Sequence, residues 1–155
     1  MSVAAVGLAF LRLVLAIVFA MVALYIAAAV LNKLLKGVDL WAELGKGNVA
    51  MGILTAGIFI SVAAIVAPGV AGLFKRIALL PIALGFVQLV IAIGLAVAMQ
   101  YLGLWVFGKL TREIEEWEEL KKGNVAIGVA MAAIVIAVAV VVTQGVATLI
   151  EAIFA

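Results

Sequence analysis

The sequence contains neither cysteine nor histidine. Disulfides, thiolate and imidazole metal sites, a histidine ligand to haem, and catalysis by either side chain are therefore excluded. Charged residues make up only 12 %, and the formal net charge of +2 is too small to indicate a nucleic-acid partner. A glycine-rich phosphate loop and a nucleophile–base pair are missing as well. We therefore expect no enzyme, no metal and no cofactor.

Apolar residues, in contrast, make up 70 % of the 155 residues, far above the roughly 45–50 % of a soluble domain. The charges gather mainly at 33–46, 75–76 and 109–122, which leaves four apolar stretches of the ~20 residues that cross a bilayer. This pattern predicts an all-α integral membrane protein with four transmembrane helices in contact with membrane lipid. The first stretch is too long for a signal peptide and lacks its basic start, so we expect it to be retained.

The chain repeats itself after seventy-six residues. The segment KGNVA at 46–50 recurs at 122–126, and Trp41 and Gly52 recur as Trp117 and Gly128. We divide the single membrane domain into repeat 1, residues 1–76 with an elbow at 32–47, and repeat 2, residues 77–155 with an elbow at 108–123. Because each two-helix unit returns the chain to its starting side, the two repeats should be parallel, related by a pseudo-two-fold axis along the membrane normal.

Each elbow carries apolar residues at helical spacing among charged ones, which predicts a short amphipathic helix lying in the membrane interface. Helices are expected over 34–44 and 113–120. Trp41 and Trp117 would anchor them at headgroup depth, with Lys46 and Lys122 marking the interface. A solvated charged loop is the alternative interpretation.

Four polar residues are candidate functional side chains. Asn48 and Asn124 are placed to cap the helices that follow them, or, facing each other across the pseudo-two-fold axis, to hold an ion or water. Arg12 and its repeat counterpart Gln88 lie inside apolar stretches, where a charge is a functional candidate by default. If Arg12 lies near the end of its span, it can instead reach the headgroups.

The remaining polar residues of the spans are isolated, and we expect structural roles for them. Thr55, Ser61 and Thr143 should bond to the backbone of their own helices, and Gln100 can bridge two helices.

The doubled pattern W-x-E-L-x-K-G-N-V-A-x-G, at 41–52 and 117–128, resembles the bacterial and archaeal membrane family known as domain of unknown function 350. That resemblance covers nearly the whole chain and implies a duplicated two-helix unit. It implies no activity.

These observations favour a small non-catalytic membrane protein, a self-associating scaffold or accessory subunit. The alternative is an oligomeric channel or transporter for ions or small solutes. We expect a homo-oligomer in the cell membrane, with a possible protein partner on the elbow side. Seven lysines and arginines in the elbows predict that the elbows are cytoplasmic and both termini outside.

Overall fold

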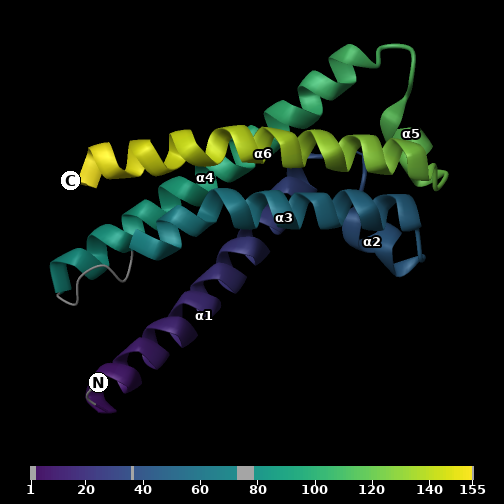
Figure 1. Ribbon diagram of the computed structural model, residues 1–155. Helices are drawn as coiled ribbons and strands as arrows, with labels where there is room; N and C mark the ends of the chain where they lie inside the picture. Colours follow the sequence, from purple (N-terminus) through teal and green to yellow (C-terminus); the bar gives the residue numbers. More distant parts are fainter. Residues whose placement is uncertain (1–2, 36, 73–78, 155) are drawn as a thin grey trace.

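The protein is described by a computed structural model over residues 3–35, 37–72 and 79–154 (Figure 1). All regular structure in those ranges is helical. Four of the helices are long, and each of the two short ones, at the elbows, lies between two long helices. Their bounds are α1 Val3–Leu34, α2 Leu40–Gly45, α3 Val49–Gly72, α4 Leu79–Leu110, α5 Glu116–Lys121 and α6 Val125–Phe154.

Helices α1, α3, α4 and α6 are long and apolar enough to cross a membrane, as the sequence predicted. At 1.5 Å per residue, the 32 residues of α1 and of α4 extend about 48 Å, well beyond the ~30 Å hydrocarbon core. In Figure 1 the outer ends of α1 and α6 lie at one end of the molecule, and α2 and α5 lie together at the other.

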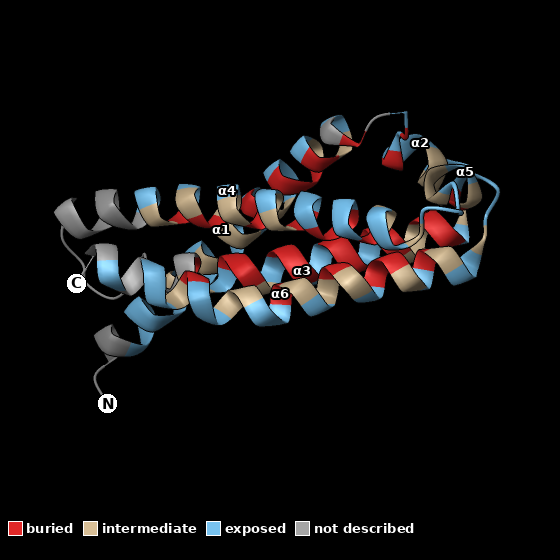
Figure 2. Cartoon of the chain, turned by 90° about the horizontal axis from the view of Figure 1, so that it is seen from above, coloured by how far each residue is buried: buried red, intermediate tan, exposed pale blue. Residues whose placement is uncertain are grey.

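The core is centred on α3, as the buried stripe in Figure 2 shows. One face of α3 carries large side chains of which at most 1 % is exposed, namely Met51, Leu54, Ile58, Val62 and Ile65. Two buried hydroxyl groups share this helix: Thr55 donates to the Met51 carbonyl at 2.8 Å, and Ser61 donates to the Gly57 carbonyl at 2.5 Å. Thr143 bonds in the same way to Ala139 of α6. These three hydroxyls bond to their own helices, as predicted.

Helices α3 and α6 pack side by side with their backbones nearly in contact (Figure 1). A Cβ atom added at Gly128 would lie 2.5 Å from the Ala50 carbonyl oxygen, and one added at Gly57 would lie 2.7 Å from the Ala132 Cβ. The distance between the two helix backbones is therefore possible only because these two residues are glycines and have no side chain. Lipid tails and apolar side chains are equally hydrophobic, so helices in a membrane gain little from hydrophobic burial. They gain van der Waals packing energy instead, usually by close approach at small residues.

The elbow helices are shorter than predicted. The chain leaves the helical conformation after Leu34, Gly37 adopts a φ of 80°, and α2 starts only at Leu40. The second elbow also turns before α5, through described residues none of which has a positive φ, so the predicted helix over 113–120 begins three residues late, at Glu116. Apolar spacing alone had extended both helices through residues that form turns.

Candidate functional site

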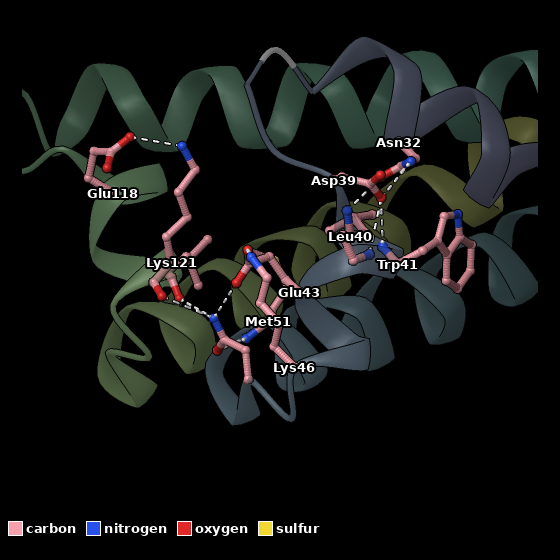
Figure 3. Close-up of polar contacts among 12 residues, drawn as sticks. Asn32, Asp39, Leu40, Trp41, Glu43, Lys46, Met51, Glu118 and Lys121 are labelled. Carbon is pink, nitrogen blue, oxygen red and sulfur yellow. Dashed lines mark hydrogen bonds and ion pairs between the residues drawn. The ribbon is translucent and has the colours of Figure 1, made fainter.

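The elbow end of the molecule holds most of its polar contacts (Figure 3). Asp39 forms the N-cap of α2, where its carboxylate accepts from the backbone N–H groups of Trp41 at 3.0 Å and Ala42 at 3.2 Å. Asn32, on the last turn of α1, accepts from the Leu40 N–H at 2.7 Å and donates to Asp39 at 3.3 Å. The Ala42 and Asn32 hydrogen bonds are the chief reasons why the pKa of Asp39 is lowered. This junction ties α2 to α1.

The same type of backbone turn follows each of the two elbow helices. Gly47 and Gly123 have φ values of 78° and 83°, a left-handed conformation that glycine adopts without strain. In the first copy the Gly47 N–H donates to the Leu44 carbonyl and the Asn48 N–H donates to the Glu43 carbonyl, at 2.9 and 3.2 Å. The second copy repeats both bonds. This pair of bonds is the Schellman motif, so the Lys-Gly-Asn signature ends each elbow helix.

The same turn organises a carboxylate network in each repeat. Glu43 accepts from Lys46 Nζ at 2.6 Å and from Asn48 Nδ2 at 3.1 Å. Glu119, its counterpart, accepts from Lys122 at 2.8 Å and from Asn124 at 2.9 Å.

These hydrogen bonds favour the charged forms of the groups involved. The lysine and then the asparagine hydrogen bonds lower the pKa of each glutamate, and the Glu119 carboxylate raises the pKa of Lys122. Both networks therefore hold an ionised carboxylate at neutral pH.

Asn48 and Asn124 differ in what else they contact. The Asn48 side chain accepts from the Met51 N–H at 3.1 Å, the hydrogen bond of an N-cap on α3. Its amide nitrogen also reaches across to repeat 2 and donates to the carbonyls of Leu120 at 2.8 Å and Lys121 at 3.4 Å (Figure 3). Among the described residues, Asn124 has only the Glu119 bond for its side chain. Asn48 is thus a clamp between the two elbows, a role that the doubled pattern did not show.

The two elbow tryptophans also have different surroundings. Trp41 is 45 % exposed and its ring lies 6.3 Å from that of Phe59. Trp117 is half-buried against the core. It lines a groove of about 510 Å³ together with Tyr101, Trp105, Lys109 and Arg112. Lys109 Nζ lies 5.6 Å from the centre of the Trp105 ring, within range of a cation–π contact.

Arg12 and Gln88 lie far from the elbow network. Arg12 lines a groove beside the Val66–Val70 turns of α3, and Gln88 lies early in α4, so both occupy the half of the molecule opposite the elbows. Arg12 Nε and Gln88 Oε1 are buried without a hydrogen-bond partner. The four candidate polar residues therefore do not meet in one site.

The prediction that Gln100 bridges two helices is wrong. Its side chain is fully buried in α4, and neither its amide oxygen nor its amide nitrogen has a hydrogen-bond partner. Burial without a partner costs free energy, which makes Gln100 the least satisfied polar group in the core of the described chain.

No three carboxylates among the described residues come close enough to hold a metal ion. What the elbow groups do is join chain segments: α1 to α2 through Asn32, each elbow to its own span through the Lys-Gly-Asn turn, and repeat 1 to repeat 2 through Asn48.

Comparison with known proteins gives one match. A family model described as "Domain of Unknown Function (DUF350)" matches the chain twice, over residues 3–84 and 81–154. Neither a curated protein nor a solved structure matches the chain. The two matches correspond to the internal repeat read from the sequence.

Proposed function

Since the chain belongs to the DUF350 family, a family of unknown function, we propose that it acts as a non-catalytic multi-pass membrane scaffold or accessory subunit that self-associates. The observation that carries this proposal is the saturation of the elbow network. Glu43, Asn48 and Glu119 are occupied by bonds within the chain, so the strongest polar cluster stabilises the fold and has few groups left for a substrate.

The proposed architecture is two parallel repeats with interfacial elbow helices. It is supported by the common starting end of α3 and α6, their side-by-side packing, and the matching turns that precede them. Trp41, with nearly half its surface exposed on α2, is suited to headgroup depth. In this arrangement the elbows face the cytoplasm, where their charged surface is available to a protein partner.

Self-association is supported by the way α1 diverges from the other helices (Figure 1). In its most apolar stretch 17 % of the residues are buried, against 56 % in α3. Phe10, Met21 and Tyr25 are each at least 66 % exposed and lie on one side of the helix, which leaves this face open to lipid or to a second copy.

Cysteine cross-linking in membranes tests self-association, because the chain has no native cysteine. A single cysteine at Met21, on the exposed face of α1, is expected to form a disulfide-linked dimer on mild oxidation. Ala23, which is fully buried, gives the matched control that should stay monomeric. Monomers from every exposed position of α1, α4 and α6 would contradict the proposal.

An oligomeric channel is the second candidate, and Gln100 is the observation that favours it. Its amide is fully buried without hydrogen-bond partners, and atoms of Gln88 and Arg12 are unsatisfied as well. Polar groups that line a path for water or ions in an oligomer would lack partners in this way in a single copy. Ion or solute flux through proteoliposomes, lost in Gln100→Leu but kept in Asn124→Ala, would favour the channel. Proteoliposomes no leakier than empty vesicles would favour the scaffold.

A further inference from the structure

A groove of about 580 Å³ separates the first half of α1 from the second half of α3. It is lined by alanines from both helices, Ala9, Ala16 and Ala20 from α1 and Ala63 and Ala67 from α3, and by an equal number of larger apolar side chains. Both alanines on α3 are exposed, so none of the described residues of a single copy fills this space.

Among the described residues that line the groove, Arg12 is the only charged one. Its Nε atom is buried and has no hydrogen-bond partner. Neither α1 nor α3 contains an acidic residue, so the two helices that form the groove offer this guanidinium no counter-ion. The groove is therefore a long apolar surface with one unpaired positive charge.

The position of Arg12 along α1 indicates its depth in the bilayer. Arg12 and Lys33 are separated by twenty-one residues, about 32 Å of helix, which matches a ~30 Å hydrocarbon core. With Lys33 at the elbow-side interface, Arg12 reaches the headgroup layer of the opposite leaflet. The groove continues from Arg12 to Leu24, about 18 Å of helix and slightly more than the ~15 Å depth of one leaflet.

We propose that the groove binds one anionic phospholipid of the leaflet on the side of the termini. Its phosphate pairs with the Arg12 guanidinium, whose planar donors match phosphate geometry, and one acyl chain lies between α1 and α3. The net negative charge of the headgroup carries the selectivity, because the phosphate of a zwitterionic lipid is offset by that lipid's own cation. An acyl chain is already in apolar surroundings elsewhere in the bilayer and gains only packing contacts. The proposal depends on membrane insertion and is independent of the scaffold function.

A helix from a second copy is the competing occupant. Helices α1, α3 and α4 of a second copy contain no acidic residue, so each would fill the apolar surface but cover Arg12 without supplying an anion, and burying an unpaired charge is costly. Among the long helices only α6 carries an acid, Glu151, and its pairing with Arg12 of another copy is an outcome that the test below distinguishes. An anionic phospholipid supplies an anion for Arg12 and an acyl chain for the apolar surface, which is why we favour it.

Native mass spectrometry of the detergent-purified protein, equilibrated with equal amounts of phosphatidylglycerol and phosphatidylcholine, tests the site. The wild type is expected to retain one lipid, with roughly tenfold preference for phosphatidylglycerol. Arg12→Gln should abolish the preference, and Arg12→Lys should keep part of it. Lys33→Gln, which removes a cation at the other end of α1, is the matched control and should behave as wild type.

Filling the groove tests the position of the acyl chain. Ala63→Phe on α3, or Ala16→Phe on α1 should the first variant fail to fold, is expected to reduce retention of both lipids at least fivefold. Circular dichroism and size-exclusion profiles establish folding. The proposal is overturned if Arg12→Gln keeps the preference, if Lys33→Gln loses it equally, or if filled variants retain lipid normally. It is also overturned if Arg12→Gln changes only the oligomeric state, which would indicate a second copy in the groove.

Discussion

Replacing Asn48 with alanine tests the clamp between the repeats, and Asn124 provides the matched control in the other repeat. Asn48→Ala removes the bond to Glu43, the N-cap bond to Met51 and the bonds to the Leu120 and Lys121 carbonyls. An N-cap is worth about 0.5–2 kcal/mol. A hydrogen bond between membrane helices averages roughly 0.6 kcal/mol.

The Leu120 carbonyl keeps its bond from the Gly123 N–H, so the substitution strands no buried acceptor. We therefore expect Asn48→Ala to lower the free energy of unfolding by about 1–3 kcal/mol. Asn124→Ala loses one bond to Glu119 and should cost at least about 1 kcal/mol less, roughly a fivefold difference in the unfolding equilibrium.

Unfolding with sodium dodecyl sulfate in bicelles, followed by circular dichroism, measures both free energies. Asn48→Asp adds a sharper test, because aspartate keeps the cap acceptor but cannot donate to Leu120 and places a second carboxylate beside Glu43. It should be destabilised at least as much as Asn48→Ala at neutral pH. Equal losses in Asn48→Ala and Asn124→Ala would show that neither the cap nor the bonds to repeat 2 stabilise the fold, and a wild-type Asn48→Asp protein would show that Asn48 acts as a cap alone.

Three further predictions follow from the packing, the carboxylates and the charge distribution. Gly128→Ala should be strongly destabilising, because its Cβ would meet a backbone oxygen at 2.5 Å, whereas Gly52→Ala should be tolerated, with its nearest atom at 3.7 Å; denaturant titrations of the two variants compare them. Glu43 and Glu119 have pKa values below the ordinary 4.5, so their contribution to the free energy of unfolding is complete above that pH and is lost as the pH falls through the lowered values. The free energy of unfolding measured from pH 7 to pH 3 should show this loss, and the variant with glutamine at both positions should lack it. A single cysteine at Glu115 should resist an impermeant thiol reagent applied to intact cells while one added at the N-terminus reacts; the reverse pattern would invert the topology.

Local features of this protein could be read from its sequence. Long apolar runs predict helices that cross a bilayer because the backbone must satisfy its own hydrogen bonds in lipid. The Lys-Gly-Asn turn was equally accessible, since a left-handed glycine and a capping asparagine act through neighbours within a few residues. Asp39 was accessible for the same reason: an acid directly before an apolar helix start is a typical N-cap, and weighing it would have shortened the predicted elbow helix.

The relations between helices were decided by the tertiary structure alone. The sequence presents Asn48 and Asn124 as equivalents, yet only Asn48 reaches the opposite repeat; Gly52 and Gly128 are equivalents too, yet only Gly128 lies against another backbone. The physical reason is that lipid and protein core are equally apolar, so hydrophobic periodicity does not mark which helix face is buried. Which small residue meets which backbone, and where Arg12 opens onto a groove, follow from how α1 and α6 pack against α3.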